Sequence, residues 1–173
     1  MFFIDLDRFK QVNDSLGHDY GDLLLVEVSR RLSELLRADD TIAWIGGDEF
    51  VVLLEIHKGS RHLGNIAQKI TEAVDFPVLL QEHQVNIGAS IGIALYPQDA
   101  SDSSTLLRHA DIAMYHAKQL GRNTFQFFTL RMNFEASERL AKESTVKLAY
   151  ANEEFLNYYQ PIIDTDTGKA AGF

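Results

Sequence analysis

Three carboxylates stand where a chain can gather acidic groups around a cation. Asp5 and Asp7 close an apolar run at residues 2–4, which is typical of a buried strand, and Asp48 follows the glycine pair Gly46–Gly47. We expect Asp5 and Asp7 to point to opposite faces of the strand, so that only one faces a given site. Where the glycine turn lies beside this strand, Asp48 approaches Asp5. Two carboxylates with no basic group between them suit a hard cation, Mg²⁺ or Mn²⁺.

Such a site supports nucleotidyl transfer. Two metal ions polarise an attacking hydroxyl and a phosphoryl group together, and the glycines let the backbone approach a phosphate closely. The same spacing also fits an ordinary hairpin turn with strand-end aspartates in solvent. Taken by itself, the spacing favours that plainer interpretation, because short motifs often match by chance.

Hydrophobic periodicity predicts the elements that must position these groups. It indicates helices over about 18–36, from about 66 to a stop before Pro77, and from a cap among 101–104 to Gly121. Strands are predicted at 41–45 and 49–56 around the glycine pair, at 78–80 and 85–96 as a second hairpin, and at 124–128, with a polar loop after the first strand. This order predicts an α/β (α+β) sandwich, a mixed, mostly antiparallel sheet with helices packed on it, in the ferredoxin-like or polymerase-palm class.

Composition limits the function classes. The 173 residues suffice for one well-cored domain plus a fragment, and 46% of them are hydrophobic, which is a globular composition. The net charge of -9 opposes binding to a nucleic-acid polymer, so a phosphate ligand must be met by metal ions and a few placed cations. No apolar run is long enough for a membrane span, and the absence of cysteine fits a reducing compartment. We expect a cytoplasmic segment, whose parent protein has any membrane anchor upstream.

Residues 1–129 are expected to form the principal domain. The stretch 132–149 is rich in Glu, Lys, Arg and Ala, so a solvent-exposed linker helix is predicted over 130–152. Residues 155–163 have a strand-like composition and 164–168 form a turn. The last segment, 153–173, is too short to bury a core alone.

Several separated segments together resemble the GGDEF family of nucleotidyl cyclases, in the family's order. They are Phe3–Lys10, Asn13–Asp14, Gly17–Asp22, Gly46–Phe50 and Ala110–Tyr115 running on to Asn123. The resemblance covers residues 2 to about 128, and the segments are far more specific jointly than singly. It implies a diguanylate cyclase, which joins two GTP molecules into cyclic di-GMP with release of pyrophosphate.

The resemblance implies metal and catalytic roles. Asp5 and Asp48, with the Leu6 carbonyl, match the metal ligands. Asp48 also matches a residue that helps to deprotonate the attacking 3′-hydroxyl, and we assign Asp48, Glu49 and Lys10 to catalysis. A homodimer is required, because each half-site supplies one nucleophile and one electrophile.

The resemblance also implies substrate contacts. Asn13 and Asp22 match the residues that read guanine, since a carboxylate accepts from the N1 and N2 donors and an amide pairs with the acceptor edge. His18 accompanies them. Singly, each of these residues also fits an ordinary turn, cap or solvated helix end. The matched phosphate contacts are Phe9, Lys10, Lys118 and Arg122.

Regulation follows the family's pattern, whereas the active site departs from it. Arg37 and Asp40 resemble the inhibitory site for the product cyclic di-GMP, although the pair also fits a solvated helix end. Trp44 stands where the family usually has arginine, which removes a cation that would neutralise phosphate. We expect this segment to lack the helix that precedes the first strand in the family.

The end of the chain resembles a second family. Residues 154–164 with Thr167–Gly168 are similar to the entry strand of EAL phosphodiesterases, which hydrolyse cyclic di-GMP. We therefore expect 153–173 to begin an EAL domain covalently linked to the cyclase domain. The alternative function is a weak or inactive GGDEF domain that binds GTP or cyclic di-GMP and regulates the adjacent EAL domain, and Trp44 favours this alternative.

Overall fold

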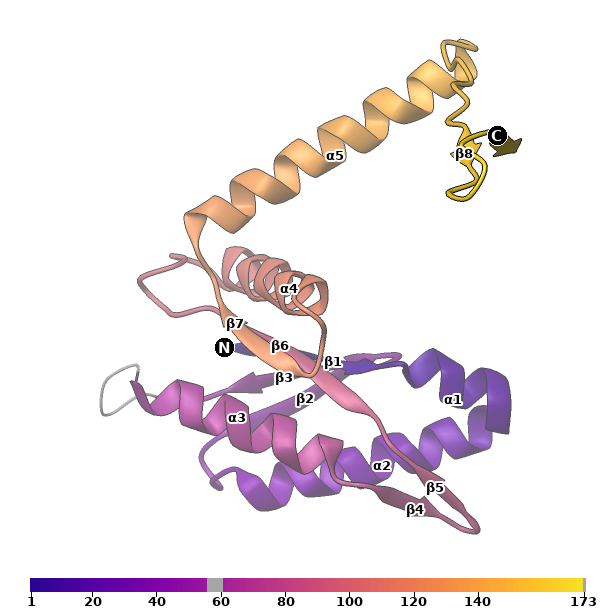
Figure 1. Cartoon of the computed structure of the whole chain (residues 1–173). Coiled ribbons are helices and arrows are strands. Elements are labelled where there is room, and N and C mark those ends of the chain that lie inside the picture. Colours follow the sequence, from indigo (N-terminus) through magenta and orange to yellow (C-terminus); the bar gives the residue numbers. More distant parts are fainter. Residues whose placement is uncertain (56–60, 173) are drawn as a thin grey trace. The chain divides into compact units, whose positions relative to one another are not determined.

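In the computed structural model, which describes residues 1–55 and 61–172, a five-stranded sheet forms the centre of the fold. Neighbouring strands run antiparallel except β6 and β7, which are parallel. The predicted mixed, mostly antiparallel sheet is therefore confirmed. In the order β2-β3-β1-β6-β7 (Figure 1), the strands are β2 (Thr41–Gly46), β3 (Glu49–Leu53), β1 (Phe2–Asp7), β6 (Gly88–Ile93) and β7 (Thr124–Phe127).

Helices cover both faces of this sheet. Along β1, Phe2, Ile4 and Leu6 join the core beneath α2 (His18–Leu35) and α3 (Arg61–Asp75). Phe3 joins a second core beneath α4 (Ser103–Gln119). Figure 1 shows α2 and α3 on one side of the sheet and α4 on the other. The alternation of side chains along β1 thus builds the two layers that flank the sheet.

Gly92 in β6 allows α4 to approach the sheet closely. A Cβ built at Gly92 would lie 1.9 Å from the Ala110 carbonyl oxygen and 2.2 Å from the Met114 nitrogen. Ala113 and Ala117 of α4 are fully buried as well. Small side chains on both elements therefore bring the last turn of α4, which carries Lys118, over the end of β1.

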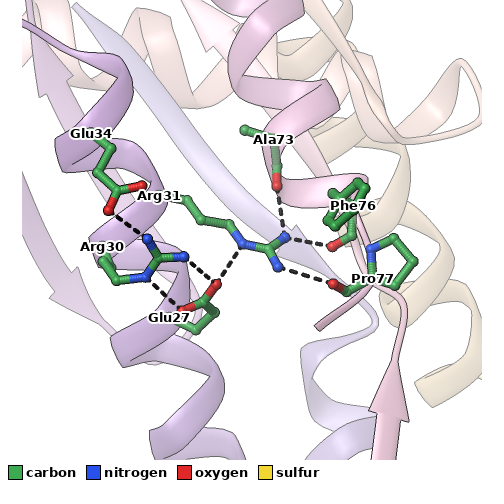
Figure 2. A network of polar contacts seen from close by, with 7 residues as sticks. All are labelled: Glu27, Arg30, Arg31, Glu34, Ala73, Phe76 and Pro77. Atoms are coloured by element: carbon green, nitrogen blue, oxygen red, sulfur yellow. Dashed lines mark hydrogen bonds and ion pairs between the residues drawn. The ribbon is translucent and has the colours of Figure 1, made fainter. Parts of the chain in front are cut away.

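Arg31 joins α2 to the end of α3 (Figure 2). Its guanidinium donates to the carbonyls of Ala73, Phe76 and Pro77, and its Nε lies 2.8 Å from Glu27 Oε1 on its own helix. These carbonyls lie in the last turn of α3 and just beyond it, where helical acceptors lack backbone donors. The guanidinium satisfies these acceptors and holds α2 against α3.

Two stretches differ from the predicted elements. Residues 8–17, expected as a loop, contain α1 (Phe9–Leu16), whose buried Phe9 and Val12 lie three residues apart on one face. Residues 85–96, expected as one strand, divide between β5 (His83–Val85), which pairs with β4 (Val78–Leu80), and β6, which pairs with β1. The predicted helices at 18–36, 66–76 and 101–121 and the glycine hairpin are confirmed. Ile56, the predicted end of that hairpin, lies outside the described residues.

The chain divides into two compact units, Met1–Phe134 and Glu135–Phe173. The first holds the sheet and both cores. α5 (Leu130–Ala151) begins in the first unit and continues into the second, which also contains β8 (Ile162–Ile163) and β9 (Ala170–Gly172). Of the stretch 155–163, which was predicted to be strand-like, only the last two residues form a strand. In the described part of the chain, no helix is both long and apolar enough to cross a membrane. The predicted boundaries at 129 and 152 stay a prediction.

Candidate active site

The end of β1 carries Asp5 and Asp7 on the face that α4 covers. Strand pairing places Glu49 of β3 and Ser90 of β6 directly beside Asp5, so these side chains share one face. Asp7 lies on the same face, because its Oδ1 accepts a hydrogen bond from Ser90 Oγ at 2.8 Å. The prediction that Asp5 and Asp7 point to opposite faces is wrong, since side chains two residues apart in a strand lie on one face.

The glycine turn brings Asp48 next to the end of β1. Gly46, the last residue of β2, and Gly47, which follows it, have φ angles of 148° and 58°, in the region that glycine adopts without strain. The Leu6 N–H donates to the Asp48 carbonyl oxygen at 3.1 Å. The Asp48 charge also contributes to the raised pKa of Asp5. Asp5 and Asp48, far apart in the sequence, therefore lie close enough for their charges to interact.

Lys118 reaches into this acidic cluster from α4. Its Nζ lies 2.6 Å from Asp5 Oδ2, and Asp5 is 6% exposed. Burial raises the pKa of Asp5 to about 6, Lys118 opposes the rise, and the charges of Asp48 and Asp7 add to it. Lys118 therefore offsets only part of the cost of ionising Asp5.

Glu49 and Asp111 extend the cluster. Partial burial raises the pKa of Glu49, and the charges of Asp111 and Asp48 contribute to the rise. Partial burial also raises the pKa of Asp111, whereas Lys118 lowers it. Asp111 was not among the predicted site residues. Its spacing of two helical turns before Lys118, on one face of α4, is the signal that would have found it.

Asp7 holds the turn that follows α4. Its Oδ2 accepts a hydrogen bond from the Asn123 N–H at 2.9 Å, and Arg122 Nε lies 4.0 Å from its Oδ1. The Arg122 side chain is 56% exposed, so its guanidinium is accessible to a ligand. Asp7 therefore positions the turn that presents Arg122. Its partners Ser90 and Asn123 were missed by sequence reasoning, because only the tertiary contact links them to Asp7.

The donor set at the end of β1 fits a divalent cation that also binds phosphate. Asp5 and Asp48 offer hard oxygen ligands, and Leu6, whose carbonyl is the third predicted ligand, is tied to Asp48 by its own N–H. Within residues 1–55 and 61–172, no group of three or more Asp, Glu, His or Cys side chains is arranged to hold a metal ion. Mg²⁺ usually takes one or two carboxylates and completes its shell with water and substrate phosphates, so two carboxylates fit it.

The predicted phosphate contacts Phe9 and Lys10 form the first turn of α1. Arg8 precedes this helix in a left-handed conformation and provides no side-chain cap. The Gln11 N–H donates to the Arg8 carbonyl at 2.9 Å. The N–H groups of Phe9 and Lys10 precede the helical acceptors and suit an anion. Phe9 is buried in the core and Lys10 is exposed. No contact among the described side chains joins Lys10 to the carboxylate cluster.

Asn13 of α1 lies against Gly21 of α2, the neighbour of Asp22. A Cβ at Gly21 would lie 1.9 Å from Asn13 Oδ1. This oxygen is buried and has no hydrogen-bond partner among the described residues, whereas Asp22 is exposed. A buried acceptor without a donor is uncommon in native proteins, and this one is covered by the close contact with Gly21. His18, predicted to accompany them, is exposed at the first residue of α2.

A groove of about 450 Å³ opens between α2 and the β2–β3 hairpin. Trp44 from β2 is 59% exposed, and its indole Nε1 donates to the Gly47 carbonyl at 3.1 Å. The groove has the volume of a small-molecule site. Its lining residues are Asp22, Leu25, Val26 and Ser29 from α2, Trp44 from β2 and Phe50 from β3.

Arg37 and Asp40 lie in the turn between α2 and β2. Asp40 Oδ2 accepts a hydrogen bond from the Arg37 N–H at 2.9 Å, and the Asp40 N–H donates to the Arg37 carbonyl at 3.0 Å. The carboxylate of Asp40 thus closes the turn, and the exposed Arg37 guanidinium is not engaged by it. This turn precedes β2, whereas the glycine turn that carries Asp48 follows it, so the two turns lie at opposite ends of that strand.

Comparison with known proteins assigns the family. Residues 1–124 match the family model described as "Diguanylate cyclase, GGDEF domain". The chain belongs to the GGDEF family of diguanylate cyclase domains, a family of nucleotidyltransferases. The resemblance found from the separated sequence segments is therefore confirmed for this part of the chain.

Relatives of this domain occur within longer signalling proteins. The bifunctional diguanylate cyclase/cyclic di-GMP phosphodiesterase MucR of Pseudomonas aeruginosa is 43% identical over 172 residues, which cover 99% of this chain and 25% of MucR. The diguanylate cyclase TpbB of the same species is 42% identical over 125 residues, which cover 72% of this chain and 29% of TpbB. The crystal structure of the TpbB GGDEF domain matches with a TM-score of 0.72 and 42% identity over 75% of this chain and 81% of that chain. This chain thus spans between 25% and 29% of the length of these two relatives.

Proposed function

We propose that this domain is a diguanylate cyclase module that condenses two GTP molecules into cyclic di-GMP and two pyrophosphates. The observation that carries the proposal is the convergence of Asp5 and Asp48 at the end of β1, with Lys118 against Asp5. Membership of the GGDEF family and the named activity of TpbB support it.

The proposed reaction forms two phosphodiester bonds in turn. The 3′-oxygen of one GTP attacks the α-phosphorus of the other, and the bond from that phosphorus to the oxygen bridging to the β-phosphate breaks as pyrophosphate leaves. The hydroxyl proton passes to Asp48, which we assign as the base, with Glu49 beside it. The same exchange with the roles reversed closes the ring. Because each domain holds one GTP, two copies of the domain must face each other.

The residues that hold the triphosphate surround the end of β1. A divalent cation held by Asp5, Asp48 and the Leu6 carbonyl would supply charge neutralisation and polarise the phosphoryl group. The Lys118 ammonium, which pairs with Asp5 in the structure, is placed to bind a phosphate oxygen. The exposed guanidinium of Arg122 adds a second cation.

The start of α1 and the α1–α2 contact complete the nucleotide site. The uncapped first turn with Phe9 and Lys10 provides N–H donors for a phosphate. Asn13 and Asp22 would read the guanine, the amide facing its acceptor edge and the carboxylate facing its N–H donors. His18, exposed at the first residue of α2, would lie at the edge of this nucleotide site.

Regulation and domain linkage form part of the proposal. Arg37, whose guanidinium is exposed on a turn closed by Asp40, would bind the phosphates or guanine of cyclic di-GMP as an inhibitory site. We propose that residues 153–173 begin an EAL domain in a tandem protein. The bifunctional character of the relative MucR supports this arrangement.

Product formation tests the proposal. The 173-residue chain is incubated with GTP and Mg²⁺, with Mn²⁺ or with EDTA, and cyclic di-GMP and pyrophosphate are followed in parallel with GTP binding by calorimetry. Product is expected with either metal and not in EDTA, and Asp48→Ala should abolish it. Glu135→Ala, at the start of the second unit, serves as the unchanged control. Wild-type protein that neither binds GTP nor forms product would refute the proposal.

One observation favours the regulatory alternative. Trp44 places a neutral aromatic ring where the family usually has arginine, so this domain has one cation fewer near the phosphates. GTP binding without cyclic di-GMP formation would then be the result of the same experiment. That outcome would assign the domain as a nucleotide sensor for a neighbouring EAL domain.

A further inference from the structure

Trp44 is an exposed aromatic side chain held in a fixed orientation at the wall of the groove. The indole is 59% exposed, and its N–H donates to the Gly47 carbonyl at 3.1 Å, in the turn that also carries Asp48. Because the indole donor is already satisfied within the hairpin, the ring offers a ligand its flat face and not a hydrogen bond. A large aromatic surface that is both exposed and immobilised suits stacking, since little rotamer entropy is lost on contact.

The groove beneath Trp44 has the chemistry of a purine site. Leu25, Val26 and Phe50 make its lining apolar, and its volume of about 450 Å³ accommodates a bicyclic base. Asp22 is the acidic group of this lining, at the end of α2 that contacts Asn13 through Gly21. A planar ligand with N–H donors on one edge satisfies both walls, because its edge pairs with the Asp22 carboxylate while its face lies on the indole.

We propose that Trp44 is a stacking platform for the purine base of the bound nucleotide. The inference rests on the proposed GTP binding and adds a specific contact to it. Asp22 selects between bases through their N–H donors, whereas Trp44 adds affinity that is independent of the base, because every base has a π face. Nucleotide affinity in this domain then depends in part on an aromatic contact from Trp44, at a position where the family usually has arginine.

The single tryptophan of the chain makes this contact directly observable. Titration of the wild-type chain with GTP and Mg²⁺ should quench the indole fluorescence to saturation, whereas Mg²⁺ with tripolyphosphate, which has no base, should leave it unchanged. By calorimetry, Trp44→Ala should weaken GTP binding about 5- to 100-fold. Trp44→Phe should retain affinity within about fivefold. Neither variant should alter the affinity for tripolyphosphate.

Controls separate failure of this inference from failure of the proposed function. Leu79→Ala removes a side chain that is 72% exposed on β4, outside the groove lining, and should bind GTP like the wild type. Calorimetric GTP binding that is lost in Asn13→Ala but unchanged in Trp44→Ala, with no fluorescence change, would overturn the stacking role and leave the proposed function intact. If the wild-type chain binds no GTP in Mg²⁺, both fail together. Circular dichroism verifies folding. If Trp44→Ala does not fold, the fluorescence comparison of GTP with tripolyphosphate in the wild-type chain carries the test, and equal responses to both would overturn the stacking role.

Discussion

Asp5 is a carboxyl group that the fold buries among other acidic groups. Its pKa rises to about 6 because burial disfavours the charged form, and the charges of Asp48 and Asp7 add to the rise despite the ion pair with Lys118. A raised pKa means that the folded chain holds this proton more tightly than the unfolded chain. In the absence of a cation, ionised Asp5 therefore costs stability at neutral pH, as is common where a site is built for function.

This linkage predicts a pH-dependent effect of Asp5→Asn. In EDTA, Asp5 should contribute stability that is complete below its ordinary pKa of 3.8 and is lost as the pH rises through its raised pKa of about 6. Relative to the wild type, Asp5→Asn should therefore gain about 2 kcal/mol between about pH 4 and pH 7. Urea unfolding of both chains at each pH measures the gain, and saturating Mg²⁺ should reduce it. A difference that does not vary with pH would contradict the assignment.

At the scale of elements, the junction of α2 and α3 depends on Arg31 and not on its neighbour Arg30. The Arg31 side chain is 12% exposed and donates to three carbonyls at the end of α3 (Figure 2). Arg31→Met should cost about 2 kcal/mol in urea unfolding, because it leaves those acceptors without a donor. Arg30→Met is the matched control, since Arg30 is 52% exposed and contacts Glu27 and Glu34 on the helix surface. Its loss should be below about 0.5 kcal/mol, and equal losses would refute this explanation.

Two glycine substitutions, one where α4 packs on β6 and one in α3, should have opposite effects on the stability of the domain. Gly92→Ala should destabilise the domain by about 3 kcal/mol, because the new methyl would lie 1.9 Å from the Ala110 carbonyl oxygen. Gly64→Ala is the control within α3, where the new Cβ would meet the Phe125 ring at an ordinary 3.6 Å. It should stabilise the helix by up to about 1 kcal/mol. Thermal unfolding that shows no loss for Gly92→Ala would mean that α4 can shift away from the sheet.

At the scale of the whole molecule, the first unit should fold without the second. The buried hydrophobic residues of the described chain all lie between Phe2 and Met132, within the unit Met1–Phe134. A chain that ends at Phe134 should therefore unfold in one cooperative transition, with a free energy within about 1 kcal/mol of that of the 173-residue chain. Calorimetry and urea unfolding by two probes measure this. Loss of cooperativity on truncation would show that residues 135–173 contribute to the core.

Some elements were predictable because their signal is local. The apolar residues of α2 repeat at helical spacing, and the glycine pair marks the β2–β3 turn, so both elements were found from the sequence. α1 was missed because only Phe9 and Val12 of its eight residues are buried, which is too short a pattern to stand out. β5 and β6 were merged because strand composition does not tell which strand is the partner.

The sequence by itself determined the family, the fold class and the residues that are able to do chemistry, because separated motifs and hydrophobic periodicity are written in the order of residues. Only the tertiary structure decided how those residues meet. It put Asp5 and Asp7 on one face, set Lys118 at 2.6 Å from Asp5, added Asp111 to the cluster and placed Trp44 over a groove with Asp22. The physical reason is that charge, burial and stacking depend on distances between side chains, and strand register and helix packing, not sequence separation, set those distances.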